Sequence, residues 1–512
     1  MGCHNEGWMT VSAVAEAPKA DLERYFVLGT VTLATMMFAM AVTNSYVVLP
    51  QMQGSLSATQ DQIAWSVTFN LVAMAVLTPT SGWLADRFGR RAVMLWCVAG
   101  FSVSTLLCGT AMTLEALVAY RIAQGALGAP ITPLSQAIIL NAFPRHQHAV
   151  ATAVWGMGVV VGPIIGPTLG GFIAEAYNWR WVFFMILPVC VLSVLGIWIF
   201  ITESQSDRNN RLDWTGFLAL ALAIGSLQLM LDRGERLDWF NSLEIIVEAS
   251  LAVIGFYIFV VHSFTSTEPF LRPQLLLDRN FALGLVFALV FGALAFVPMV
   301  LLPTLLQDLR GFPDSVVGVV LAARGVGSMI GTVTVVWMSR FDPRISLAIG
   351  FLSQGFSGLF MAQFDLNVSI WDAMWTSALQ GIGNSYLWVP LTVLAFATLP
   401  ARQMGEGTAV FHLIRNLGSA LFISVCVGVV VHYTGVNYSV ISEHISEFNE
   451  AFHLSSVAGG WNIDTLDGVA RAGREVGRQA SMIGYINAFY LFSAVSFAIV
   501  PFIFFLKLPG EK

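Results

Sequence analysis

The second half of the chain is an approximate copy of its first half, and this internal repeat constrains the fold more than any other feature. Five short matches occur in the same order at a nearly constant offset of 253 to 256 positions. They pair 26–29 with 281–284, 49–50 with 302–303, 83–91 with 337–344, 124–125 with 380–381, and 152–154 with 408–410. In a strongly apolar chain, a parallel duplication of this length is typical of transporters whose halves move around a shared site. The sequence therefore predicts two bundles related by a pseudo-twofold axis along the membrane normal.

The composition argues strongly against a soluble protein. Hydrophobic residues make up 56% of the 512-residue chain and charged residues 11%, whereas a soluble domain carries roughly a quarter charged residues. Apolar runs near 26–50, 92–111, 182–201, 281–306 and 483–506 reach the about 20 residues that a helix needs to cross a bilayer. The short in–out alternation of outer-membrane barrel strands is absent. We expect an all-α integral membrane protein.

The apolar pattern predicts fourteen helical spans, in groups of six, two and six. Their centres lie near residues 38, 73, 101, 127, 162, 192, 222, 254, 293, 326, 354, 385, 418 and 495. An even number of crossings places both termini on one side of the membrane. Of the 25 Lys and Arg residues, 15 fall in segments assigned to the cytoplasm and 7 in outer loops. The positive-inside rule therefore predicts cytoplasmic termini.

The expected domain organisation follows the repeat. It comprises a cytoplasmic tail (1–25), an N-terminal six-helix bundle (26–202), a two-helix central insertion with its linkers (203–280), a C-terminal six-helix bundle (281–506) and a second cytoplasmic tail (507–512). The longest loop, about 432–482, is predicted to face outward. Its composition fits either a docking surface or an ordinary flexible loop.

The tight turn after the second predicted span carries the motif Gly82-Trp83-Leu84-Ala85-Asp86-Arg87-Phe88-Gly89-Arg90-Arg91. Its glycines let helices approach and the chain reverse direction. Asp86 places an anion at the membrane face, where a helix N-terminus favours a carboxylate, and the repeat suggests the helix that begins near 405–407. The motif predicts a conformational gate formed by Gly82, Asp86, Arg87, Gly89, Arg90 and Arg91. The alternative is that the arginines only anchor the turn.

Two further motifs lie inside predicted spans. Arg121 is expected to face an internal polar cavity, because an arginine at the centre of a span costs roughly 2.5–3.5 kcal/mol on insertion scales. The fifth predicted span carries small residues four apart, which permit close helix packing, and two prolines, which interrupt the hydrogen-bond ladder. This Gly-Pro seam consists of Gly158, Gly162, Pro163, Gly166, Pro167, Gly170 and Gly171.

Together these motifs, the extra central pair of spans and the segment 225–234 resemble the major facilitator superfamily and, within it, the EmrB branch (EmrB/QacA) of fourteen-span drug:proton antiporters. The resemblance runs from about residue 34 to 506. It implies export of hydrophobic or amphipathic toxic compounds across a bacterial inner membrane, driven by the proton gradient. It also implies a periplasmic adaptor, an EmrA-type membrane fusion protein, and a TolC-type outer-membrane channel. The alternative is a dedicated exporter of a specific metabolite or fatty acid on the same fold.

The resemblance links Arg121 to proton coupling, with a purely structural role as the alternative. However, Ala41 and Asn487 stand where the family often carries acids, and neither side chain can gain a proton. The remaining candidate acids are poorer, because Glu115, Glu175 and Asp308 lie at outer span ends and Asp86 and Glu406 at the inner face. His412 titrates near neutral pH when unperturbed and shares a helix face with Arg415. The coupling candidates are therefore Arg121, Gln124, His412 and Arg415, and a hydrogen-bonding core role is the alternative for His412.

Polar residues inside the other spans are the candidates for a substrate cavity. They are Asn44, Gln136, Arg324, Gln380, Asn384 and Asn416. An alternative is that the substrates are anions which these arginines, with Arg415, bind directly.

Several other classes of function are excluded. The three lysines, Lys19, Lys507 and Lys512, follow no glycine-rich loop, so an ATP-driven pump is not supported. A basic domain for nucleic-acid binding is absent. The histidines and the five cysteines are scattered, so we expect neither an enzyme, a metal site nor a cofactor.

Overall fold

The computed structural model describes residues 21–58, 60–144, 147–203, 212–234, 236–266, 269–338, 342–400, 403–446, 449–450 and 465–506. Residues 1–20 of the expected N-terminal tail and the whole of the expected C-terminal tail, 507–512, lie outside this set. So do 447–448 and 451–464 of the expected outer loop.

The described residues are helical, and no strand occurs among them. The first half contains α1 (Asp21–Val47), α2 (Leu49–Ser55), α3 (Gln60–Leu77), α4 (Thr80–Phe88), α5 (Arg90–Thr110), α6 (Leu114–Gly128), α7 (Ile131–Ala142), α8 (His148–Ala176), α9 (Trp181–Phe184) and α10 (Leu187–Phe200). The insertion contains α11 (Trp214–Arg233) and α12 (Leu243–Thr265). The second half contains α13 (Arg279–Thr304), α14 (Asp314–Met338), α15 (Pro343–Met361), α16 (Ile370–Phe396), α17 (Met404–Ser442) and α19 (Leu466–Ala498). The short helical turns are η2 (Trp239–Asn241), η3 (Pro273–Leu277), η4 (Leu305–Leu309) and η7 (Val500–Phe505).

A helix covers each of the fourteen predicted span centres. Within the described residues, ten helices are long and apolar enough to cross a membrane, or eleven if Trp65–Leu77 and Thr80–Phe88, bent by 56°, form one span. The prediction of an all-α, multi-pass membrane protein is confirmed, and the count of fourteen stays a prediction. The short helix α6 shows one reason why the count is lower, since its 15 residues fall short of the about 20 that a helix needs to cross a bilayer.

The two halves pack their helices in corresponding pairs. In the first half α1 packs on α8 and α3 on α6, and in the second half α13 packs on α17 and α14 on α16. The close approaches also repeat. A Cβ atom at Gly162 would lie 2.5 Å from the Met36 carbonyl oxygen of α1, and one at Gly418, 256 positions later, would collide with the Leu289 carbonyl oxygen of α13. The repeat in the sequence is therefore also a repeat in the packing.

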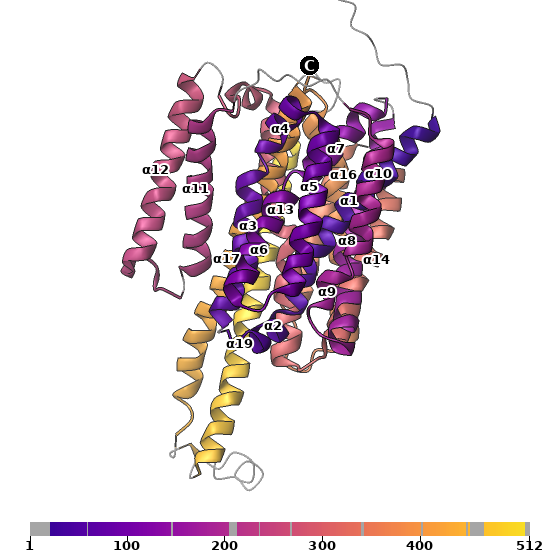
Figure 1. Ribbon diagram of the computed structural model, residues 1–512. Helices are drawn as coiled ribbons and strands as arrows, with labels where there is room; N and C mark the ends of the chain where they lie inside the picture. The colour runs from indigo at the N-terminus through magenta and orange to yellow at the C-terminus, as the bar shows by residue number, and fades with distance from the viewer. Residues whose placement is uncertain are drawn as a thin grey trace, which may run out of the picture.

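The two seams between the halves differ. Along one seam α8 and α14 pack over much of their length, whereas at the corresponding seam α3 and α17 touch at few points. The inserted helix α11 covers this second seam and packs against both α3 and α17. Thr68 of α3 donates to Asp232 of α11 at 2.8 Å, and Gln228 of α11 donates to Ser424 of α17 at 3.3 Å. Figure 1 shows α11 and α12 at the side of the bundle.

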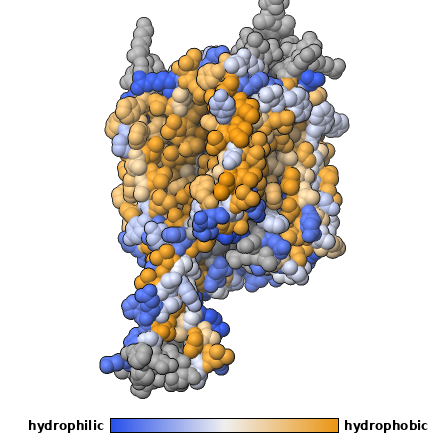
Figure 2. Space-filling view, turned by 90° about the vertical axis from the view of Figure 1, so that its left-hand side faces the viewer, coloured by the Kyte–Doolittle hydropathy of each residue, from blue (hydrophilic) through white to orange (hydrophobic). Residues whose placement is uncertain are grey.

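Apolar side chains form a broad band on the face of the molecule shown in Figure 2, with hydrophilic residues at both ends of the band. The start of α1 and the end of the described chain lie at the same end of the bundle, the end that also holds α4 (Figure 1). This arrangement agrees with an even number of crossings.

The helices α17 and α19 continue past this band as a projecting hairpin (Figures 1 and 2). With 39 residues, α17 is about 58 Å long, roughly twice the hydrocarbon thickness of a bilayer. The expectation of a loop over 432–482 is therefore wrong for 432–442 and 466–482, which are helical. A drop in mean hydropathy indicates where the chain leaves the membrane. It does not indicate where a helix ends, because the backbone hydrogen bonds of the helix continue past that point.

Candidate functional site

The two halves enclose a cavity at the centre of the bundle. Two adjoining pockets share Val159, Pro163, Phe296 and Arg415 in their walls. They contain about 770 Å³ and 530 Å³ of space not filled by protein atoms, space open to solvent included. Helices α1, α3, α7, α8, α13 and α17 line the first pocket, and α14 and α16 contribute to the second.

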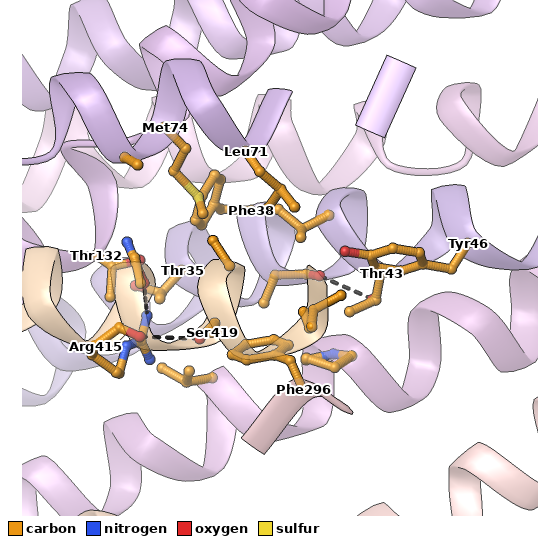
Figure 3. A pocket seen from close by; sticks show the side chains of 18 residues that line it. Thr35, Phe38, Thr43, Tyr46, Leu71, Met74, Thr132, Phe296, Arg415 and Ser419 are labelled. Carbon is orange, nitrogen blue, oxygen red and sulfur yellow. Dashed lines mark hydrogen bonds between the residues drawn. The ribbon is translucent and has the colours of Figure 1, made fainter. Parts of the chain in front are cut away.

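The walls are mostly apolar and aromatic, and their polar groups are few. In Figure 3, Arg415 and Thr132 lie at one end of the first pocket and Tyr46 at the other, with Phe38 and Leu71 between them. Among the described residues that line either pocket there is no Asp or Glu. The polar lining consists of Thr35, Thr43, Tyr46, Thr132, Asn416, Ser419, Arg324, Ser328, Asn384 and Arg415. Such a lining fits an amphipathic ligand.

Arg121 lies outside these pockets, at the centre of the N-terminal half, and is 2% exposed. Its guanidinium donates to the Ser45 hydroxyl of α1, to Gln124 Oε1 at 2.6 Å and to the Ser66 carbonyl of α3 at 3.2 Å. Gln124 in turn donates to the Thr105 hydroxyl of α5 at 2.8 Å. Within the described part of the chain, no carboxylate forms an ion pair with Arg121. The guanidinium therefore joins α1, α3 and α6 through neutral acceptors, and Gln124 extends the network to α5.

In the C-terminal half, a glutamine at the equivalent position again accepts a hydrogen bond from an arginine, but this arginine belongs to a different helix. Gln380, which repeats Gln124, accepts a hydrogen bond from Arg324 of α14. Arg324 also donates to the Ala295 carbonyl of α13 at 2.6 Å and to the Met299 sulfur. The cation thus comes from the helix equivalent to α3, whereas Arg121 belongs to α6.

The backbone packing confirms this correspondence. A Cβ atom at Gly125 would collide with the Asn70 carbonyl oxygen, and one at Gly381 would collide with the Arg324 carbonyl oxygen. Asn70 and Arg324 are therefore equivalent positions, 254 residues apart, and Ser377 stands at the position equivalent to Arg121, 256 residues later. The repeat of residues 124–125 at 380–381 indicates that the glutamine is kept in both halves. Only the contacts show that the arginine comes from a different helix in each half.

His412 links the two halves near the end of the bundle that holds α4. Its Nε2 atom lies 2.6 Å from Gln136 Oε1 of α7, and both side chains are buried. The Trp388 ring packs 6.0 Å from the His412 ring and 6.1 Å from the Trp155 ring of α8. Of these side chains, Trp388 also lines the cavity.

The Gly-Pro seam packs α8 between its own half and the other one. Gly158, Gly162, Gly166 and Gly170 face α1, and a Cβ atom at Gly166 would lie 2.5 Å from Asn44 Oδ1. Gly171 faces α14 instead, where a Cβ atom would lie 2.7 Å from the Asp314 carbonyl oxygen. Pro163 lines the cavity, and Pro167 lies one turn further along α8.

The gate loop joins α4 to α5 through Gly89, which has φ 85° and so lies in the left-handed region that favours glycine. The Arg87 guanidinium lies 5.5 Å from the Trp83 ring centroid, and Arg91 donates to the Trp198 carbonyl of α10 at 2.6 Å. Gly82, Asp86 and Arg90 line a small cavity together with Thr408 of α17. That helix begins at Met404, beside the predicted 405–407.

The structure separates the predicted cavity residues into two groups. Arg324, Asn384 and Asn416 line the cavity. Asn44, Gln136 and Gln380 are not among its described lining residues, and a substrate-binding role for any of the six stays a prediction. Their amides are engaged elsewhere: Asn44 donates to the Val182 carbonyl at 3.5 Å, and the other two accept from or contact His412 and Arg324 as described above.

Sequence reasoning missed Asp232. It lies in the last turn of α11 and accepts the hydrogen bond from Thr68 of α3, a helix that lines the cavity. The available signal was an acid directly after an apolar run, within the segment 225–234 that carries the family resemblance.

Comparisons with known proteins agree with this architecture. A sequence model of the Major Facilitator Superfamily matches residues 31–423. The chain is 32% identical over 492 residues to the multidrug export protein EmrB of Haemophilus influenzae (93% of this chain, 94% of that protein). It is 29% identical over 488 residues to the protein of that name in Escherichia coli K12 (93% and 94%). It is 28% identical over 491 residues to the fatty acid resistance protein FarB of Neisseria gonorrhoeae (93% and 95%).

Solved structures share the fold. A bacterial homologue of the human lysosomal transporter Spinster, inward-facing and unoccupied, superposes with a TM-score of 0.58 at 17% identity, covering 96% of this chain and all of that one. A POT family transporter in complex with a peptide conjugate superposes with a TM-score of 0.61 at 13% identity (93% and 96%).

Proposed function

The chain belongs to the Major Facilitator Superfamily and, within it, to the EmrB-type transporters, and from this premise we propose that it is a multidrug efflux transporter. It exports hydrophobic and amphipathic toxic compounds across the inner membrane by proton antiport. The observation that carries this proposal is the apolar, aromatic-lined cavity between two homologous halves. The multidrug export relatives align with 93% of the chain. The similarity to FarB is compatible with a dedicated fatty acid exporter but does not favour it.

Transport proceeds by rocking of the halves around this cavity, because each end carries its own set of contacts between the halves. At the end near α4, His412 pairs with Gln136 and Trp388 packs on Trp155. At the other end, Thr168 of α8 donates to the Gly318 carbonyl of α14 at 2.9 Å. Breaking one set while the other holds would open the cavity to one side only.

Proton coupling requires a group that gains and loses a proton, and we assign this role to Asp232. Ala41 and Asn487 cannot titrate, whereas the Asp232 carboxylate lies at the contact of α11 with α3. Its hydrogen-bond donor Thr68 lies on α3, the helix whose residues Leu71 and Met74 line the cavity.

In liposomes that contain the purified protein, a fluorescent amphiphile is expected to accumulate against its gradient when a proton gradient is imposed. Asp232→Asn should abolish the response to the proton gradient, because an amide does not exchange the proton. Asp467→Asn, the same change at an exposed position of α19, should leave transport unchanged. Transport that a protonophore does not affect would contradict antiport.

The projecting hairpin of α17 and α19 is the part of the chain that we assign to the adaptor contact. With cytoplasmic termini, it extends into the periplasm, where an EmrA-type membrane fusion protein would connect the transporter with a TolC-type channel. Its exposed apolar side chains include Val436 at 46% and Val440 at 50% exposure. Apolar side chains exposed outside the lipid band are typical of protein contacts.

Val440→Asp is expected to abolish co-purification with the adaptor and drug resistance in cells, because a buried, unpaired carboxylate is costly at an interface. Transport in liposomes, where no adaptor is present, should stay at the wild-type rate. The neighbouring variant Ser439→Asp adds the same charge at an exposed polar position and serves as the control. Full resistance after deletion of the adaptor gene would show that the chain acts alone.

A further inference from the structure

The inserted helix pair is fastened to the C-terminal half next to the gate loop. We propose that this fastening keeps the inner gate, the contact of that loop with the start of α17, closed. Asp213 and Arg272 act as positioning residues, because they hold the strap segment, residues 269–272 between α12 and η3, across the seam between α3 and α17. This inference rests on the proposed function and adds to it a role for the inserted pair in gating.

Asp213 joins three parts of the chain. Its carboxylate caps α11 by accepting from the Gly216 amide at 3.1 Å, and it also accepts from the Phe270 amide of the strap segment at 3.0 Å. The His262 ring of α12 lies 2.9 Å from the same carboxylate. The Asp213 side chain is only 11% exposed, and hydrogen bonds to an ionised group are stronger than neutral ones. The start of α11, the end of α12 and the strap segment therefore form one unit.

The strap segment lies where the two halves meet at this end of the bundle. Phe270 and Leu271 pack against a buried apolar cluster whose members come from three neighbouring helices. They are Ala75 near the end of α3, Leu220 and Ile224 of α11, and Leu413 near the start of α17. Because α3 belongs to the first half and α17 to the second, separation of these helices would uncover apolar surface that is now buried. The strap segment therefore stabilises the closed arrangement.

Arg272 connects the strap segment with the gate loop. Its backbone amide donates to Glu406 Oε1 at 2.7 Å, and its Nε atom lies 3.8 Å from Glu406 Oε2. Glu406 stands in the first turn of α17, two residues before Thr408. Thr408 in turn lines the small cavity beside Asp86 and Arg90 of the gate loop. The Arg272 side chain is 54% exposed, and exposed ion pairs contribute little, so the hydrogen bond from the backbone amide is the main link.

The test separates this backbone link from the ion pair. The Arg272 φ angle of −78° is within the range of proline, so Arg272→Pro removes the backbone donor and keeps φ, whereas Arg272→Gln removes only the ion pair. The readout is the rate at which a membrane-impermeant maleimide, added on the cytoplasmic side of inside-out vesicles, labels Thr408→Cys in a Cys3→Ser background. Thr408 is 1% exposed and the other four cysteines are buried.

Arg272→Pro and Glu406→Ala should each raise the labelling rate roughly tenfold, because both remove the same hydrogen bond to a charged group. The double variant should label no faster than the faster single variant, since residues that share one interaction give non-additive effects. Arg272→Gln should change the rate by less than about fivefold. The control Arg279→Gln removes the same charge at the exposed start of α13 and should label at the wild-type rate.

Wild-type labelling rates in both Arg272→Pro and Glu406→Ala would overturn this inference, and so would a double variant whose effect is the product of the two single effects. Export of the fluorescent amphiphile, measured in vesicles of the same preparation, tests the proposed function separately. If export occurs but the labelling rates do not change, the efflux function stands and the strap segment has no role in the gate. If no export occurs without these substitutions, the efflux function itself fails.

Discussion

Arg121→Ala is expected to abolish export while the protein still reaches the membrane. The guanidinium holds α1, α3 and α6 together through Ser45, Ser66 and Gln124, and alanine leaves these buried groups without their donor. Hydrogen bonds to a charged group contribute about 1.5–3 kcal/mol each, so the loss of two shifts a conformational equilibrium by roughly 100-fold or more. The measurement is the initial export rate in liposomes, normalised to the amount of inserted protein.

Two variants define what Arg121 contributes. Arg121→Lys keeps the charge but lacks the planar fork, so export should be partly retained if charge matters and lost if the hydrogen-bond geometry matters. Asp86→Asn, in the gate loop, should reduce export only by up to about fivefold, because a carboxylate near a helix N-terminus contributes about 0.3–1 kcal/mol at exposed sites. Wild-type export by Arg121→Ala would remove this residue from the mechanism.

Gly162→Ala is expected to reduce export roughly tenfold or more and to lower the thermal stability of the purified protein. The added methyl group would lie 2.5 Å from the Met36 carbonyl oxygen and 3.0 Å from the Ala39 Cβ atom. A backbone carbonyl inside a helix cannot rotate away, so α1 and α8 must move apart. Overpacking of this kind costs about 1–3 kcal/mol, and it acts on the helix that also contacts α14 of the other half.

The matched control is Gly428→Ala in α17. It adds the same methyl group to a transmembrane helix, but no atom of a neighbouring element lies within 4 Å of the new Cβ position. Export and melting temperature should match those of the wild type. If Gly162→Ala behaves in the same way, the close contact between α1 and α8 is not required for transport.

Most of the helices could be predicted from the sequence, but the residues that line the cavity could be predicted only in part. Arg324, Asn384 and Asn416 line the cavity, whereas Asn44, Gln136 and Gln380 are engaged in hydrogen bonds elsewhere. A polar residue within a membrane span must face away from lipid. It can do so by facing an internal cavity, a neighbouring helix or the other half of the protein, and the sequence does not distinguish these three locations. Asp232 was missed for a related reason, since its partner Thr68 lies 164 positions away.

The sequence by itself determined the membrane-embedded all-helical class, the duplicated halves and the position of the inserted pair. A bilayer leaves a spanning segment only its own backbone as a hydrogen-bond partner, so apolar runs of sufficient length must be helical. The tertiary structure alone decided how each helix is rotated about its axis. That rotation depends on packing between segments far apart in the chain, and it determined that α11 covers the α3–α17 seam, that α14 supplies the arginine to Gln380 and that Arg415 faces the cavity.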